Sequence, residues 1–128
     1  MKTIKFLIVI AICIHTNFAL GLTRNGKKLW FKEPSYSFGT FHQSQIMKHE
    51  FKFKNVSKQR MVIVRASSSC GCTVVDYSTE PLFPGEWGHI TVTYKGWGKA
   101  PGFFNKGINI LTNKEVIRLE INGTMLSK

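Results

Sequence analysis

Residues 47–55, MKHEFKFKN, alternate between two kinds of side chain. One set is mainly apolar and the other is charged: Met47, His49, Phe51 and Phe53 against Lys48, Glu50, Lys52 and Lys54. Because successive side chains of a β-strand point to opposite faces of the sheet, this pattern predicts a strand with one buried face and one face in water. A helix would scatter the same residues around its surface.

Six further segments have strand patterns, with β-branched or alternating apolar residues between Gly, Pro, Asn and Ser. They are residues 36–41, 60–66, 73–77, 90–94, 104–110 and 117–121. The run at 60–66, RMVIVRA, is nearly continuously apolar, which predicts a strand well inside a sandwich that ends at the serines 67–69.

No stretch after residue 34 has the apolar spacing of a helix. Short strands with turn signals roughly every 8 to 12 residues are typical of immunoglobulin-like domains. We therefore predict an all-β protein, an immunoglobulin-like β-sandwich of about seven antiparallel strands over residues 35–128.

Residues 1–21 have the three-part pattern of a secretory signal peptide. Two lysines precede an apolar run at 6–14, and a polar stretch then ends in small residues, which predicts cleavage after Gly21. The run is much shorter than the roughly 20 residues of a membrane-spanning helix, so no transmembrane anchor is expected after cleavage. Cys13 follows Ile12 inside the run, so a lipid anchor is not expected either. The protein is predicted to be periplasmic or secreted.

Residues 22–34 lie between the predicted signal peptide and the sandwich. They lack a clear period and end in Pro34, which suggests a leader or a first edge strand that packs Leu29, Trp30 and Phe31.

The chain is strongly basic, with 18 Lys and Arg against 7 Asp and Glu, a formal charge of +11. Cleavage after Gly21 would remove Lys2 and Lys5 and leave 16 − 7 = +9. Such a charge either solvates the surface or attracts an anionic surface such as phospholipid headgroups or lipopolysaccharide. Nucleic acid is not an expected partner, because the protein is predicted to be exported and has no recognition helix or stacked-aromatic motif.

Residues 69–73, Ser-Cys-Gly-Cys-Thr, hold the only two cysteines of the predicted mature chain, Cys70 and Cys72. An extended chain would separate their Cα atoms by about 6.6 to 7.2 Å, at the upper limit for a disulfide, so a bridge would require a bend at Gly71. One interpretation is a structural bridge that shapes a tight turn. A second is a strained bridge that exchanges with other thiols.

A third interpretation is that the two thiolates bind a soft metal ion, Cu(I) or Zn(II). A closed zinc site needs four ligands, and the histidines that follow the signal peptide, His42, His49 and His89, fall on separate predicted elements. His49 shares a strand face with Phe51 and Phe53, so a hydrogen-bonded core histidine is expected there instead of a ligand. No cofactor is expected.

Enzymatic motifs are absent from the sequence. The acidic residues form no close pair, and there is no G-x-S-x-G, phosphate-binding loop or H-E-x-x-H. The sequence therefore predicts a non-enzymatic binding or structural module with a protein partner in the bacterial cell envelope. The alternative is a thiol-active protein that uses Cys70 and Cys72 for disulfide exchange or metal binding.

Five segments together resemble a known family, the one catalogued as domain of unknown function 1573. They are residues 38–40 (FGT), 47–55 (MKHEFKFKN), 69–73 (SCGCT), 84–94 (PGEWGHITVTY) and 121–123 (ING). The resemblance covers nearly all of the predicted mature chain, with Ser69, Gly71, Thr73 and His49 as the residues that support the cysteine motif. It implies an exported protein of Gram-negative bacteria with an immunoglobulin-like fold related to major sperm protein and ciliary ASH-type domains. It implies no activity.

Overall fold

The computed structural model describes residues 26–128, and the predicted signal peptide, residues 1–21, lies outside them. The described chain forms eight strands. They are β1 (Leu29–Phe31), β2 (Ser35–His42), β3 (Ile46–Asn55), β4 (Ile63–Ser68), β5 (Thr73–Tyr77), β6 (Trp87–Lys95), β7 (Gly102–Thr112) and β8 (Val116–Leu126).

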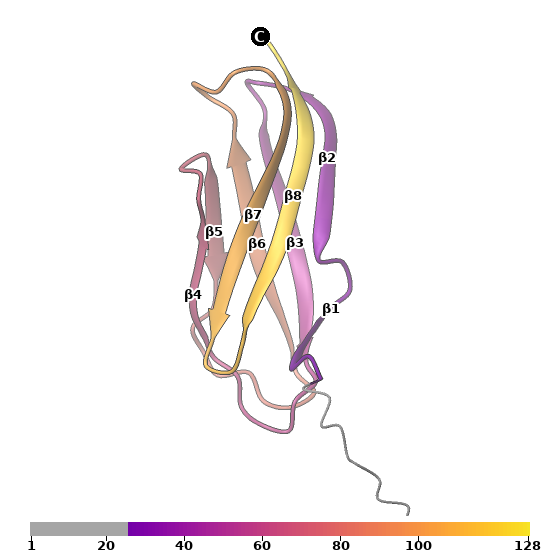
Figure 1. Cartoon of the computed structure of the whole chain (residues 1–128), viewed down its shortest axis with the longest axis vertical. Coiled ribbons are helices and arrows are strands. Elements are labelled where there is room, and N and C mark those ends of the chain that lie inside the picture. Colours follow the sequence, from indigo (N-terminus) through magenta and orange to yellow (C-terminus); the bar gives the residue numbers. More distant parts are fainter. Residues whose placement is uncertain (1–25) are drawn as a thin grey trace, which may run out of the picture.

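The strands build two four-stranded sheets with the orders β1-β3-β6-β5 and β2-β8-β7-β4. Both sheets run along the long axis of the molecule, with β4 and β5 along one side and β1 and β2 along the other (Figure 1). The prediction of an all-β, immunoglobulin-like sandwich is confirmed.

One pair of strands differs from the predicted antiparallel arrangement. β2 and β8 pair in parallel, from Ser35 beside Glu120 to His42 beside Leu126, with a register shift between Ser37 and Thr40. Both strands run toward the upper end of the molecule in Figure 1, where β2 turns into β3 of the other sheet. Side-chain alternation carries no information on the direction of a neighbour that lies far away in sequence, so the sequence could not indicate this pair.

The apolar run at 60–66 is also placed differently. β4 is an edge strand, and it begins at Ile63 and continues to Ser68. Met61 instead forms an isolated bridge with Leu82, while Ser67 and Ser68 pair with β7. Backbone pairing does not require an apolar side chain at a half-exposed edge, so the serines extend the strand instead of ending it.

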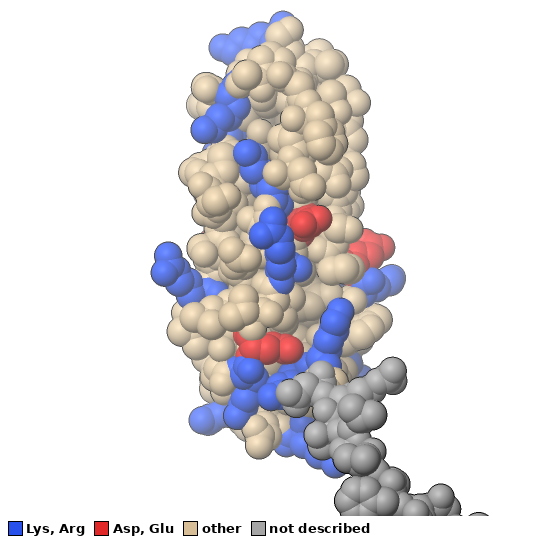
Figure 2. Space-filling model, viewed as in Figure 1, with Lys and Arg blue, Asp and Glu red and all other residues tan. Residues whose placement is uncertain are grey.

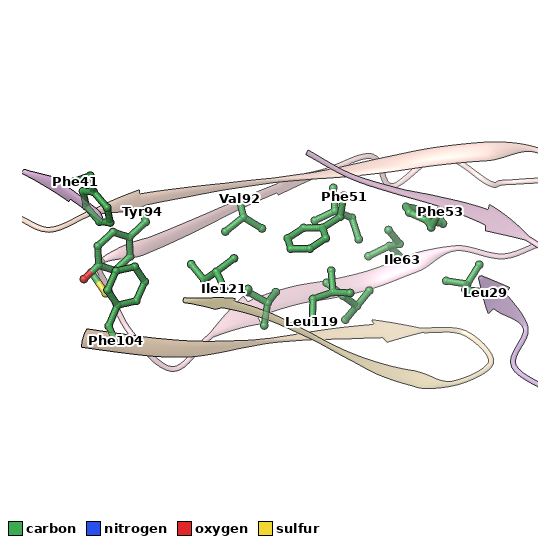
Figure 3. Close-up of a cluster of buried hydrophobic side chains, with 14 of the residues drawn as sticks. Leu29, Phe41, Phe51, Phe53, Ile63, Val92, Tyr94, Phe104, Leu119 and Ile121 are labelled. Carbon is green, nitrogen blue, oxygen red and sulfur yellow. The ribbon is translucent and has the colours of Figure 1, made fainter. Parts of the chain in front are cut away.

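The core fills the space between the two sheets with aliphatic and aromatic side chains (Figure 3). At one end of the core, on the left in Figure 3, Tyr94 and Phe104 stack with ring centroids 4.1 Å apart, and Phe41 packs edge-on against both rings. At the other end the core reaches Leu29 of β1, which is buried, whereas the neighbouring Trp30 is 46% exposed on the outer face. The predicted edge strand thus packs Leu29 and Phe31 against the core but not Trp30, because alternation places Trp30 on the opposite face.

Candidate functional site

The cysteine motif joins the two sheets on one side of the molecule. β4 ends one sheet and β5 ends the other, so residues 69–72 carry the chain from sheet to sheet. In Figure 1 this turn between β4 and β5 lies well below the top of β7.

Cys70 and Cys72 are paired as a disulfide, with their Cα atoms 5.2 Å apart. The N–H of Cys72 donates to the Sγ of Cys70 at 3.3 Å, and the N–H of Thr73 donates to the carbonyl of Cys70 at 3.1 Å. The N–H of Lys95 donates to the carbonyl of Cys72 at 2.8 Å, which ties the turn to β6. These bonds bend the chain well inside the extended span.

The two cysteines differ in exposure. Cys72 is buried, with 6% of its surface exposed, whereas Cys70 is half-buried and Ser69 and Gly71 are exposed. Gly71 does not lie in the left-handed region, and a Cβ atom added to it would meet nothing within 4 Å. The bend therefore does not require glycine at this position.

His49 lies apart from the cysteines and is not the hydrogen-bonded core histidine that we expected. It is half-buried, and its ring stacks on Tyr36 with centroids 3.5 Å apart and packs edge-on against Phe51 at 4.7 Å. Burial lowers the pKa of His49 below its usual 6.5, against the opposing effect of Glu33 and Glu50. Aromatic packing replaces a hydrogen bond here because β2 of the opposite sheet presents Tyr36 to the ring.

Within residues 26–128 no three His, Cys, Asp or Glu side chains are grouped so that they could hold a metal ion. His49 pairs with Val92 of β6, which pairs with Val75 of β5, so two strand spacings separate the histidine from the β5 edge. The structure thus brings together Ser69, Cys70, Gly71, Cys72 and Thr73, and leaves His49 elsewhere.

The strand that follows the disulfide is a regular sheet edge with little protection. Of the four edge strands in the described part of the chain, β1 has three residues, and β2 and β4 contain register shifts. β5 pairs with β6 in unbroken register, and its inward side chains are Thr73, Val75 and Tyr77, none of them charged. Charges, bulges and short length are the usual protections of an edge, and in β5 they amount to one outward charge, Asp76, and a length of five residues without a bulge. The sequence pattern of residues 73–77 predicted a strand but carried no signal that this strand lies at an edge.

The fold and this site define a small immunoglobulin-like domain whose two sheets are joined by a disulfide-closed turn. The ASH/PapD-like domain 7 of human CEP192 has the same fold, with a TM-score of 0.65 and 10% identity over 79% of this chain and 87% of that one. A protein of unknown function from Porphyromonas gingivalis W83 also scores 0.65 at 10% identity, over 75% of this chain and 46% of that one. The YadV chaperone scores 0.55 at 9% identity, over 80% of this chain and 53% of that one.

The chain belongs to the family described as protein of unknown function (DUF1573), whose model matches residues 29–125. The resemblance seen in the sequence is thereby confirmed. No curated protein matches the chain. Among the described residues there is no helix of the length and apolarity that a membrane crossing needs.

Proposed function

We propose that this protein is a non-enzymatic binding module of the bacterial cell envelope that holds a protein partner along the free edge of β5. The observation that carries the proposal is the regular edge without a bulge that starts at the disulfide turn. A partner segment in extended conformation would add a strand there, with main-chain hydrogen bonds supplying affinity. The signal-peptide pattern supports export, and a fold shared with a chaperone supports a protein partner.

The polar groups that a partner would meet can be assigned from the pairing of β5 with β6. Hydrogen-bonded and non-hydrogen-bonded pairs alternate along an antiparallel ladder, and Cys72 is bonded to Lys95. The backbone groups of Val74 and Asp76 therefore face β6, and those of Val75 and Tyr77 face away from it. Val75 thus offers a donor and an acceptor to an incoming strand.

Val75→Pro tests whether a partner binds this edge, because proline removes the outward N–H of residue 75 without removing a hydrogen bond to β6. Val75→Ala is the matched control, since it loses side-chain packing but keeps the N–H. Each protein is immobilised and incubated with envelope extract, and retained proteins are identified by mass spectrometry with cross-links mapped to β5.

We expect the wild type and V75A to retain the same proteins and V75P to lose them. Retention by all three would exclude the β5 edge as the binding site. If none of them retains a protein reproducibly, the protein is not a binding module of this kind. Thermal unfolding of each variant verifies that it is folded.

The unequal burial of Cys70 and Cys72 favours a second candidate function, thiol–disulfide exchange. A thiolate of a partner protein would attack the Sγ of Cys70, the Cys70–Cys72 bond would break, and Cys72 would leave as a thiolate that takes up a proton from water. The product is a mixed disulfide between Cys70 and the partner. The Oγ1 of Thr73 lies 3.8 Å from the Sγ of Cys72, within hydrogen-bonding range of the leaving sulfur.

Single cysteine variants distinguish this candidate from a structural bridge. Cys72→Ser removes the resolving thiol, so mixed disulfides at Cys70 should accumulate and be visible on non-reducing gels. Cys70→Ser leaves only the buried thiol and should form few adducts. Equal adduct formation by both variants, or none by either, would rule out exchange at Cys70.

A further inference from the structure

One end of the sandwich gathers exposed apolar side chains from five separate parts of the chain. This basal end comprises residues 26–30, residues 54–55 at the end of β3, the start of β6, and the loops 56–62, 78–86 and 113–116. Its exposed apolar residues are Trp30, Val56, Phe83, Trp87 and Val116, each at least 46% exposed. Large apolar side chains held in water at one end of a molecule mark an interaction surface when they form a group.

Two of these side chains form a pair on the outer face of the sheet. Trp30 of β1 and Trp87 of β6 both lie beside Lys54 of β3. The two indole rings meet edge-on with centroids 5.9 Å apart, and the Lys54 Nζ lies 5.7 Å from the centre of the Trp87 ring. Indole rings with an adjacent lysine have an apolar body and a polar, cationic end.

Basic residues outnumber acidic ones at the basal end, six to three. The basic residues are Lys27, Lys28, Lys54, Lys58, Arg60 and Lys114, and the acidic ones are Glu80, Glu86 and Glu115. Figure 2 shows Lys and Arg side chains gathered at this lower end of the visible face.

Two of the three carboxylates bind backbone groups. Glu115 accepts the N–H groups of Lys28 and Leu29 at 3.0 and 2.9 Å, and Glu86 accepts the N–H of Phe83 at 2.7 Å. The one ion pair within residues 26–128 joins Arg118 to Glu120 and involves none of the six basic side chains. Their charge is therefore available to a partner.

We propose that the basal end docks on an anionic phospholipid surface. Tryptophan rings are stable at the depth of the headgroups, lysines beside them reach the phosphates, and apolar loop residues enter the boundary of the acyl chains. Apolar contact and charge attraction are both needed for stable peripheral binding, and this end carries both. A lipid surface is favoured over a peptide because the five exposed apolar residues do not line one common groove. Trp30 and Val116 line one hollow, Trp87 lines another, and Val56 and Phe83 line neither.

Vesicle binding with matched charge variants tests the proposal. The processed protein is mixed with vesicles of phosphatidylcholine alone or with about one quarter phosphatidylglycerol, and the bound fraction is measured by sedimentation. Lys58→Gln with Arg60→Gln removes two charges at the basal end. Lys95→Gln with Lys99→Gln removes two exposed charges at the opposite end and is the control.

The wild type should bind only the anionic vesicles, with an affinity that falls as salt is raised. Each basal charge removed should weaken binding about fivefold, while the control pair should change it little. Equal losses from both pairs would show attraction to overall charge and overturn the proposal. So would equal binding to neutral vesicles, no binding, or binding to an acidic polysaccharide such as heparin without binding to vesicles.

The three tryptophans of the chain supply a second readout that reports orientation. Trp30 and Trp87 lie at the basal end, and Trp97 lies in the loop at the opposite end. In a Trp97→Phe variant, lipids that carry a quencher should quench the emission on binding. In a Trp30→Phe, Trp87→Phe variant, the remaining Trp97 should not be quenched, and quenching of Trp97 alone would place the opposite end on the lipid.

Discussion

Asn55 is the side chain on which the basal loops depend. It is fully buried, and its Nδ2 donates to the carbonyls of Gln59 and Leu82 at 2.8 Å each. Its Oδ1 accepts the N–H of Ser57 at 3.0 Å and the Oγ of Ser57 at 2.7 Å. One amide thus fixes two loops that follow different strands.

Asn55→Ala should lower the free energy of unfolding by about 3 kcal/mol, because it removes a fully buried amide that makes four hydrogen bonds to the two loops. The measurement is chemical denaturation. Asn109→Ala, on the exposed face of β7, is the control and should be nearly neutral. Identical denaturation midpoints for the two variants would contradict the role assigned to Asn55.

His49 should make stability depend on pH. Its folded pKa is lowered by burial below the unfolded value of 6.5, so the unfolded chain binds more protons in the range between the two values. The stabilisation is therefore present above pH 6.5 and is lost as the pH falls through the folded pKa.

His49→Gln should flatten the pH dependence of unfolding in this range. The pKa itself can be followed by NMR of the imidazole protons, which should titrate below 6.5 in the folded protein. A folded value above 6.5 would reverse the sign and refute the account.

Strands β3 and β6 depend on a close contact between a glycine and an aromatic ring. Gly88 pairs with Phe53, and a Cβ atom added at Gly88 would lie 2.6 Å from the ring Cζ of this buried side chain. Gly107 in β7 has a superficially similar neighbour, because an added Cβ would lie 2.5 Å from the Nη2 of Arg118. The Arg118 side chain is 64% exposed and can move away, whereas the Phe53 ring cannot.

Gly88→Ala should therefore destabilise the protein by about 1–3 kcal/mol through overpacking, while Gly107→Ala should have little effect. Thermal unfolding of the two variants side by side measures the difference. Equal destabilisation would mean that backbone freedom, and not the Phe53 ring, explains the glycine at 88.

The molecule as a whole carries a large excess of one charge. Eighteen basic residues face seven acidic ones, and the described residues contain one ion pair. Mutual repulsion of surface charges disfavours the compact state and is weakened by salt. The sandwich tolerates the repulsion because its core runs the full length between the sheets (Figure 3).

Raising sodium chloride from low concentration to about 0.15 M, where the Debye length is about 8 Å, should raise the Tm by a few degrees. The Lys95→Gln, Lys99→Gln variant carries less excess charge and should respond less. A Tm that falls over this range would show that attractive surface pairs outweigh the repulsion.

Most of the strands could be predicted from the sequence, because the alternation of side chains along a strand is a local property. Residues 47–55 are the clearest case, since buried and exposed positions there follow the sequence pattern nearly residue by residue. The cysteine motif was also visible as a local sequence feature. The parallel pairing of β2 with β8, the edge position of β4 and β5, the stacking of His49 on Tyr36 and the basal group of tryptophans and lysines could not be predicted. Each depends on contacts between residues far apart in the chain, and those contacts are set by how the two sheets pair and pack together.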